Sequence, residues 1–316
     1  MPFKGYITNQ PALDLSLHPK LYYPRHCLNT QTTCAKPVPS FIFAGSELSG
    51  ASSIFQLLKQ HPQVSQGSVD HSNQTTVFNT MDYFDEGNAF EKYMAEFPFV
   101  DDKNQDCLVG EFAPQYLYSS YFAAKRIKET LPQVKIIFFL RDPIIRAYQQ
   151  YLKENSDANL SFENLIDLEL STLRRCGYTS YQTGWEGFRR CHQGSEIRAS
   201  WKTFNDSYAF NSLAKGIYYP ALQPFLQHFP SSQLFVMKIE DVLQDPAQSL
   251  DQLARFLGID PTFFSAVPKL ETPSQPTLST QYRLQKVFRE VNKRLVELFD
   301  ESNTQFEEWT YDIDRG

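Results

Sequence analysis

The run KIIFFL at residues 135–140 limits the possible folds of this chain more than any other stretch. After Lys135, five apolar residues follow one another without a polar residue between them. Successive side chains of a β-strand point to opposite faces of the sheet, so this run places apolar groups on both faces. Such strands are typical of parallel sheets that helices cover on both sides. The run therefore predicts an α/β fold.

Much of the remaining chain repeats an alternation of short apolar runs and amphipathic segments. Further strands are predicted at 41–45, 107–111 and 233–239. Helices are predicted at 52–60, 119–131, 143–155, 213–229, 249–259 and 281–300. Strands that are separated by helices predict a three-layer sandwich with a central parallel sheet.

The same alternation suggests how the chain is divided. A length of 316 residues fits one large domain or two small ones. Residues 1–40 are rich in Pro, Tyr and Thr and have no hydrophobic period, so we expect an irregular N-terminal arm. Residues 41–316 are expected to form a single domain, with an insertion at about 156–212 where the periodicity is weak.

Charge and hydropathy argue against two classes of partner. The formal net charge is −6, so general binding to nucleic acid or to anionic membranes is not expected. No stretch approaches the roughly 20 apolar residues that span a bilayer, and the first residues lack the apolar centre of a secretory signal. We expect a soluble chain without a membrane segment, in which a local basic pocket is still permitted.

The five cysteines allow two interpretations. Cys27 with Cys34 and Cys176 with Cys191 each enclose a short loop, so two local disulfides would leave Cys107 as a buried free thiol. Alternatively, all of the cysteines are reduced, as in a cytosolic protein. Both interpretations stay open at this stage.

The segment FIFAGSELSGASS at 41–53 predicts a strand, a glycine-containing loop and the start of a helix, in the manner of a P-loop. Gly45, Gly50 and Ser52 have the spacing of the phosphate-binding pattern G-x-x-x-x-G-K-[ST], but Ala51 stands at the lysine position. Backbone N–H groups and the positive end of a helix dipole can still bind an anion. The candidate cofactor-binding residues here are Ser49, Gly50, Ala51, Ser52 and Ser53.

Arg141 directly follows the apolar run, and Asp142-Pro143 opens the next predicted helix. Asp142 fits the N-cap and Pro143 the first helical position. In an open parallel sheet, ligands bind beyond the carboxyl ends of the strands, so Arg141 is expected to project into the same crevice as the glycine-containing loop. We interpret it as an anion contact, because a guanidinium suits phosphate. The alternative is a structural ion pair with Asp142 or Glu111.

Further segments follow in a characteristic order. The loop is followed by HPQV, GEFAPQYLY, KIIFFLRDPIIRAYQQY and GIYYPALQPFLQHFPSSQLFVMKIEDVLQDP. From about Phe41 to Phe299 the chain resembles the carbohydrate sulfotransferases, most closely those of chondroitin or dermatan chains and their heparan relatives. The resemblance implies a single α/β domain that binds PAPS (phosphoadenosine phosphosulfate) as co-substrate. It also implies direct transfer of the sulfuryl group to a hydroxyl of a carbohydrate or small hydroxylated acceptor, without a metal ion.

The chain departs from this family at positions that handle charge. Leu48 stands where the family has a lysine, and Gln74 where it has the glutamate that acts as general base. Gln149 stands where a serine contacts the 3′-phosphate of the donor, and it remains a candidate donor contact. Losing the charge stabilisation at Leu48 alone is expected to raise the barrier by roughly 3 kcal/mol. Arg141 is retained.

An active enzyme needs other residues in these roles. His71 and Glu111 are the candidate catalytic bases, and Asp70 is a further one. The ordinary pKa of histidine suits proton transfer, although His71 could also be an ordinary loop histidine. Arg141 or Lys238 would supply the remaining cation.

Three functions are compatible with these features. The first is an active sulfotransferase with a rearranged site. The second is a catalytically degenerate member that binds a glycan, a nucleotide or a protein. The third, a degenerate P-loop NTPase, lacks both the lysine and a metal-binding aspartate at a strand end. Residues 174–191 would line a sugar groove or form a solvated loop. The oligomeric state stays open, as does the compartment, either the cytoplasm or the Golgi lumen.

Overall fold

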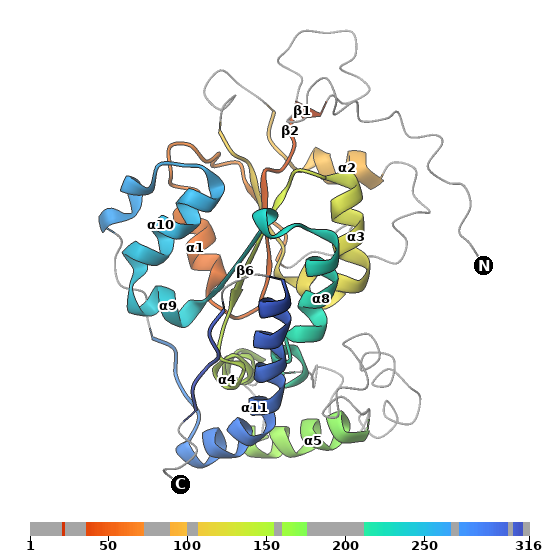
Figure 1. Cartoon of the computed structure of the whole chain (residues 1–316), viewed down its shortest axis with the longest axis vertical. Helices are drawn as coiled ribbons and strands as arrows, with labels where there is room; N and C mark the ends of the chain where they lie inside the picture. Colours follow the sequence, from red (N-terminus) through yellow and green to blue (C-terminus); the bar gives the residue numbers. More distant parts are fainter. Residues whose placement is uncertain are drawn as a thin grey trace, which may run out of the picture. The chain divides into compact units, whose positions relative to one another are not determined.

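The computed structural model describes residues 21–22, 36–72, 89–99, 107–154, 160–175, 212–266, 272–302 and 306–311 (Figure 1). The chain divides into two compact units. The first unit contains residues 1–139, 232–235 and 247–267, and the second contains residues 140–231, 236–246 and 268–316. The expected single domain over 41–316 stays a prediction.

A five-stranded sheet forms the centre of the fold. Its strand order is β4 (Val69–Asp70), β5 (Gly110–Phe112), β3 (Phe41–Gly45), β6 (Lys135–Leu140) and β7 (Leu234–Lys238). β3 pairs in parallel with both β5 and β6, and β4 pairs in parallel with β5. β3 is buried at every position, as is β6 after its first residue. The predicted α/β fold with a parallel central sheet is confirmed.

Helices flank the sheet within the first unit. They are α1 (Ala51–Leu58), α2 (Ala89–Ala95), α3 (Ser120–Thr130) and most of α10 (Pro246–Leu257), with the 3-10 helices η4 (Pro114–Ser119) and η8 (Pro261–Ala266). Figure 1 shows α1 and α10 on one side of the strands and α3 on the other. Phe55 of α1 packs on the sheet, with its ring centroid 5.4 Å from that of Phe43 and 5.5 Å from that of Phe112. These aromatic contacts fix the helix that follows the glycine-containing loop.

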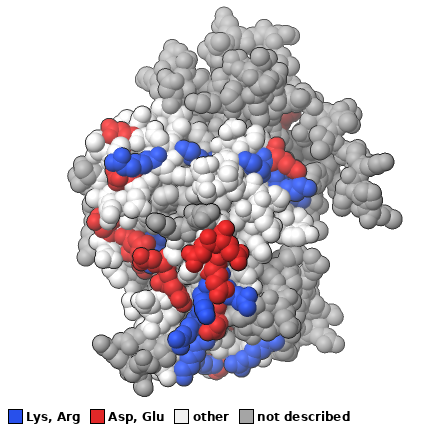
Figure 2. Space-filling model, viewed as in Figure 1, with Lys and Arg blue, Asp and Glu red and all other residues white. Residues whose placement is uncertain are grey.

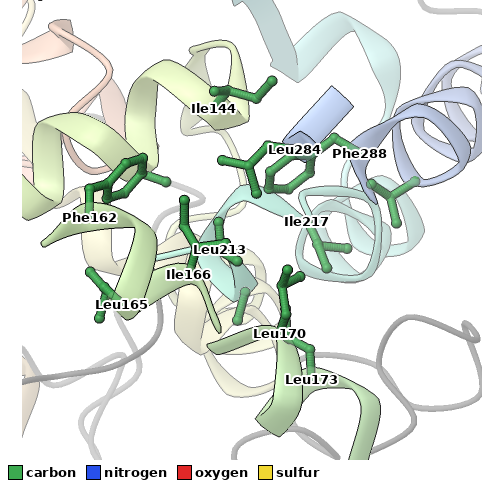
Figure 3. Close-up of a cluster of buried hydrophobic side chains, with 13 residues drawn as sticks. Ile144, Phe162, Leu165, Ile166, Leu170, Leu173, Leu213, Ile217, Leu284 and Phe288 are labelled. Carbon is green, nitrogen blue, oxygen red and sulfur yellow. The ribbon is translucent and has the colours of Figure 1, made fainter. Parts of the chain in front are cut away.

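The second unit is largely helical. It contains α4 (Pro143–Glu154), α5 (Phe162–Arg175), η6 (Ala214–Gly216), α8 (Tyr219–His228), α9 (Ile239–Gln244) and α11 (Leu278–Glu301). Its core is a cluster of buried side chains from α4, α5, α11 and the segment around η6, in which Ile144, Ile166, Ile217 and Phe288 take part (Figure 3). The cluster shows that α5, which lies in the expected insertion, contributes to the core of this unit.

The predicted helix over 213–229 is wrong as a continuous helix. The chain forms the short η6, leaves the helical conformation at Ile217 and starts α8 at Tyr219. Gly216 packs so closely that an added Cβ would lie 2.7 Å from Cβ of Pro143. Pro220 lies in the first turn of α8, where a missing N–H costs nothing. Tertiary packing therefore splits the helix that hydrophobic periodicity predicted over 213–229 into η6 and α8.

Other boundaries also differ from the expectations. The predicted strand at 107–111 starts later, at Gly110, and two short antiparallel strands, β1 (Leu21–Tyr22) and β2 (Lys36–Pro37), lie in the arm that was expected to be irregular. Cys107 is a free thiol as predicted but is half-buried rather than buried. The other four cysteines lie outside the described residues, so the two disulfides stay predictions.

On the face shown in Figure 2, the described residues form no dominant basic patch. In the face shown in Figure 2, Lys and Arg side chains and Asp and Glu side chains both occur in small groups among uncharged residues. Within the described part of the chain, no helix is both long and apolar enough to cross a bilayer. The same residues contain no group of three or more His, Cys, Asp or Glu side chains that could hold a metal ion.

Candidate functional site

Residues 46–50 connect β3 to α1 and form the loop that the sequence singles out. Leu48 has a φ of 62° and Gly50 a φ of 89°. This left-handed conformation suits glycine but is strained for leucine. Gly45 is required for space, because an added Cβ would lie 2.8 Å from Cβ of Leu117. The loop therefore turns tightly at the carboxyl end of β3, and its role as an anion site stays a prediction.

The serines of this loop divide into an inner and an outer pair. Ser49 is buried, and its Oγ donates to the carbonyl oxygen of Ser46 at 2.8 Å. Ser46 is buried too, and its Oγ donates to the carbonyl oxygen of Phe139 at 3.2 Å. Ser52 and Ser53 are exposed at the start of α1. Only the outer pair presents its hydroxyls to the surface, whereas that of Ser49 serves the loop itself.

The remaining donors of the loop are backbone groups. Ala51 N–H reaches Ser49 Oγ at 3.4 Å, while the N–H groups of Gly50 and Ser52 have no hydrogen-bond partner within the described chain. They lie at the positive end of α1, where an anion is favoured. Leu48 carries no charge, and Glu47 repels an anion. Residues 46–50 therefore contain no cation, and the donors left for an anion are backbone N–H groups.

His71 and Glu111 are brought together by the sheet. His71 Nδ1 lies 2.8 Å from Oε1 of Glu111, although the two residues are 40 positions apart. Glu111 is fully buried within β5, and His71 directly follows β4 with 2% of its surface exposed. The short distance and the burial make this a charge-assisted hydrogen bond, which is about twice as strong as a neutral one.

Two tyrosines complete the surroundings of Glu111. Tyr93 of α2 donates to Oε2 at 2.6 Å, and Tyr116 of η4 donates to Oε1 at 2.6 Å. The sequence pattern assigned neither tyrosine to the site. The helix that carries Tyr93 was not predicted, and no spacing along the chain links it to Glu111. Three side chains therefore hydrogen-bond to one buried carboxylate.

The second carboxylate beside His71 is Glu96. Its Oε2 lies 3.6 Å from Nε2 of His71, and its side chain is 47% exposed. Burial by itself lowers the pKa of His71, but the hydrogen bond and charge of Glu111, together with Glu96, outweigh it and raise that pKa above its ordinary value. His71 therefore readily accepts a proton.

The His71–Glu111 pair and the β3 loop lie at the same edge of the sheet. His71 N–H donates to the carbonyl oxygen of Phe112 at 2.8 Å, and Ala113 N–H donates to that of Phe43 at 2.9 Å. β5, which carries Glu111, therefore lies between β4, which His71 follows, and β3, which leads into the loop. At roughly 4.8 Å per strand spacing, β4 and β3 are about 10 Å apart. This is the edge where parallel sheets bind ligands.

Arg141 belongs to the second unit. It is 7% exposed, and among the described residues its Nε has no hydrogen-bond partner and its guanidinium no ion pair. Burial lowers the pKa of Arg141, and the negative charge of Glu240 partly offsets this. The alternative ion pairs with Asp142 or Glu111 are therefore not formed. That Arg141 shares a crevice with the β3 loop stays a prediction.

Other predicted site residues have ordinary partners. Asp70 is exposed, and its Oδ1 accepts from Ser72 N–H at 2.9 Å. Gln149 Nε2 donates to the carbonyl oxygen of Ser274 at 2.9 Å. Lys238 Nζ lies 3.7 Å from Oδ1 of Asp241. Gln74 and most of 174–191 lie outside the described residues.

Comparison with known proteins decides the family. The family model described as "Sulfotransferase domain" matches residues 39–306. The chain belongs to this family. The resemblance seen in the sequence is thus confirmed, and the NTPase alternative loses its basis.

Individual relatives of this chain are distant. The membrane-associated sulfotransferase kil1 of Dictyostelium discoideum is 25% identical, over 71% of this chain and 56% of that protein. The human bifunctional heparan sulfate N-deacetylase/N-sulfotransferase 3 is 27% identical, over 76% of this chain and 24% of that protein. The chain therefore spans about half and about a quarter of the length of these relatives.

A solved structure supports the fold. The sulfotransferase from Alicyclobacillus acidocaldarius superposes with a TM-score of 0.58 at 21% identity, covering 85% of this chain and 97% of that chain. This likeness concerns the fold alone.

Proposed function

We propose that this sulfotransferase transfers a sulfuryl group from PAPS to a hydroxyl of a carbohydrate or similar acceptor, with His71 as the general base. The observation that carries the proposal is the 2.8 Å hydrogen bond between His71 Nδ1 and Glu111 Oε1. When Nδ1–H donates to Glu111, the lone pair of Nε2 is left to accept a proton. In the family a glutamate is the base, and Gln74 stands at its position in this chain. His71, oriented by the buried Glu111, would act as the base instead.

The proposed reaction is a direct displacement. The acceptor oxygen forms a bond to sulfur while the bond between sulfur and the 5′-phosphate oxygen of the donor breaks. The acceptor proton moves to Nε2 of His71, and phosphoadenosine phosphate leaves with the electron pair of the broken bond. Glu111 and Glu96 lie on either side of the imidazole ring. Their charges stabilise the imidazolium that forms.

Access to His71 requires one local movement. The residue is 2% exposed, and Nε2 faces Glu96. Because the side chain of Glu96 is 47% exposed, it can turn toward solvent at little cost and admit an acceptor hydroxyl. Glu96 is then expected to affect acceptor binding more than the chemical step.

The donor contacts are proposed from two features. The buried Nε of Arg141 lacks a partner among the described residues, and a buried guanidinium with an unused donor fits a phosphate oxygen. The N–H groups of Gly50 and Ser52 are the second feature. A carbohydrate acceptor is supported by the human relative, which is named as a heparan sulfate N-sulfotransferase.

A catalytically inactive binding protein is the second candidate function. It is favoured by the uncharged Leu48, which leaves the β3 loop without a side-chain cation. It is also favoured by the hydroxyl of Ser49, which donates to the carbonyl oxygen of Ser46 within the loop. A neutral loop stabilises the charge on a leaving phosphate poorly. The donor could then bind without reacting.

The test is titration of phosphoadenosine phosphate into the protein by calorimetry, followed by turnover with radiolabelled PAPS and a panel of oligosaccharides. Micromolar binding that Arg141→Ala abolishes supports the donor site. Turnover that His71→Gln lowers at least a hundredfold, with the dissociation constant unchanged, supports the base. Arg255→Ala is the control, since that arginine is 70% exposed in an ion pair with Asp251.

The possible results separate the two candidate functions and test the donor site. Binding without turnover on any acceptor identifies a binding protein. Absence of nucleotide binding up to millimolar concentration rejects both the donor site and the proposed reaction. Donor affinity that persists in Arg141→Ala rejects the assignment of Arg141.

A further inference from the structure

The backbone around Arg141 is held on both sides by side chains. Tyr218 OH donates to the carbonyl oxygen of Arg141 at 2.8 Å. The next N–H group, that of Asp142, donates to Oε1 of Glu240 at 2.9 Å. Arg141 therefore starts from a fixed position, although its own guanidinium has an unused donor.

Glu240 is the carboxylate that acts on Arg141, yet it does not pair with it. Its charge raises the pKa of Arg141 against the effect of burial. Its Oε1 accepts from Asp142 N–H, and its Oε2 accepts from Nε1 of Trp309 at 3.0 Å. Both oxygens are thus occupied by neutral donors, and within the described residues no ion pair joins Glu240 to Arg141. The carboxylate is kept from neutralising the arginine.

Trp309 is well fixed in this position. It is 6% exposed, and its ring centroid lies 5.5 Å from that of Phe306 and 6.0 Å from that of Tyr218. Two residues later, Tyr311 OH donates to Oδ1 of Asp142 at 3.3 Å. The segment 306–311 therefore contacts both the carboxylate of Glu240 and the turn that follows Arg141.

We propose that Trp309 is a positioning residue for donor binding, because its indole N–H holds Glu240 away from Arg141 and leaves the guanidinium free for a phosphate group of the nucleotide. The proposal rests on the assignment of Arg141 to the donor site. Glu240 is half-buried, and a partly shielded carboxylate that loses a neutral donor takes another one if it can, since an acceptor without a partner is costly. The guanidinium of Arg141, which already feels the charge of Glu240, is that other donor.

The first test is Trp309→Phe, which keeps the aromatic packing and removes the N–H. The dissociation constant for phosphoadenosine phosphate, measured by calorimetry, is expected to rise about tenfold or more, because Glu240 then competes with the nucleotide for Arg141. The control is Tyr151→Phe, which removes a hydrogen bond of 3.1 Å to the carbonyl oxygen of Leu160 in the same unit. It should leave the constant unchanged within twofold. Melting curves establish that each variant is folded.

The second test is the double variant Trp309→Phe with Glu240→Gln. Removing the charge of Glu240 removes the competitor, so the affinity should return to that of the wild type or exceed it. A merely structural role of Trp309 predicts no such rescue. A double variant as weak as Trp309→Phe, or a single variant with an unchanged constant, overturns the proposal.

A third measurement does not depend on the nucleotide. The Nε–H signal of Arg141, recorded by NMR in protein with ¹⁵N-labelled arginine and assigned with Arg141→Lys, reports whether an ion pair forms. It should move in Trp309→Phe and return in the double variant. If the wild type binds no nucleotide, the proposed donor site fails, while this signal still decides whether Trp309 separates the two charges. A signal that is identical in all three proteins rejects that role.

Discussion

His71 and Glu111 form a buried pair in which Nδ1 of the imidazole lies 2.8 Å from a carboxylate oxygen. The pair lies between two neighbouring parallel strands, since His71 follows β4 and Glu111 belongs to β5. Tyr93 and Tyr116 donate to the same carboxylate from α2 and η4. Four elements of the first unit therefore meet at one carboxylate, which makes it both a structural centre and the orienting group of the proposed base.

Removing the charge of Glu111 is expected to lower the pKa of His71. Burial already disfavours the imidazolium, and the hydrogen bond and charge of Glu111 lead the effects that oppose it. In Glu111→Gln the pKa of His71 should fall below that of the wild type, and in Glu96→Gln it should fall by less. Titration of the His71 Cε1–H signal by NMR measures both. An equal or larger effect of Glu96→Gln would contradict the ranking.

The hydroxyl of Tyr116 is expected to contribute to stability. Tyr116 is fully buried and donates to Glu111 at 2.6 Å. In Tyr116→Phe the free energy of unfolding should fall by about 1–3 kcal/mol, the usual effect of losing a hydrogen bond to a charged group. Tyr121→Phe is the control, because Tyr121 is 63% exposed and should change stability by less than about 0.5 kcal/mol. Urea unfolding of both variants provides the comparison, and equal effects would argue against the hydrogen bond as the cause.

Restoring a cation in the β3 loop is expected to strengthen donor binding. Leu48 lies in the loop that presents the N–H groups of Gly50 and Ser52. In Leu48→Lys the dissociation constant for phosphoadenosine phosphate should fall about tenfold, which corresponds to about 1.4 kcal/mol. Leu48→Met, an uncharged change of similar size, controls for the strained φ of 62°. An improvement shared by both variants would point to loop conformation rather than charge.

Asp142 is expected to make stability depend on pH. Burial, with a further contribution from Glu240, raises its pKa from 3.8 to about 7. Between these values the folded protein keeps a proton that the unfolded chain loses, so this contribution to stability falls as the pH rises from about 4 to about 7. The slope can reach about 1.4 kcal/mol per pH unit.

Asp142→Asn isolates this contribution. Asparagine keeps an acceptor for Ile144 N–H and Tyr311 OH, which both donate to Asp142 Oδ1. The stability of the variant relative to the wild type should therefore increase from pH 5 to pH 8 in urea unfolding. Asp251→Asn, in an exposed ion pair of α10, should show a flat difference. A flat difference for Asp142→Asn as well would mean that its carboxyl group is ionised throughout.

Gly216→Ala tests the packing that divides the predicted helix at 213–229. The new Cβ would lie 2.7 Å from Cβ of Pro143 and 3.2 Å from Cε1 of Phe288. Overpacking of this kind should lower the free energy of unfolding by about 1–3 kcal/mol. Gly258→Ala meets no atom within 4 Å but has a φ of +82°, so it should cost about 1–2 kcal/mol through backbone strain alone. A stabilised Gly216→Ala variant would show that periodicity, not packing, governs this segment.

The sequence by itself determined the strands 41–45 and 135–140 to the residue, because each is a continuous apolar run that ends at a polar or loop-forming residue. The family resemblance and the loss of the loop lysine at Leu48 were likewise readable without coordinates. β4 and α2 were not. A strand of two residues has no period of its own and exists only because Val69 and Asp70 pair with β5.

The candidate site shows the same division. Side-chain chemistry alone singled out His71, Glu111 and Arg141. The hydrogen-bond partners around them could not be predicted. Tyr93 and Tyr116 donate to Glu111, and Trp309 donates to Glu240, from segments that no local sequence pattern connects to these carboxylates. Hydrophobic periodicity reports which face of an element is buried, whereas a hydrogen bond between residues 40 or 69 positions apart depends on how the elements pack. Only the tertiary structure brings Glu111 into hydrogen-bond contact with His71 and places the indole N–H of Trp309 on the carboxylate of Glu240.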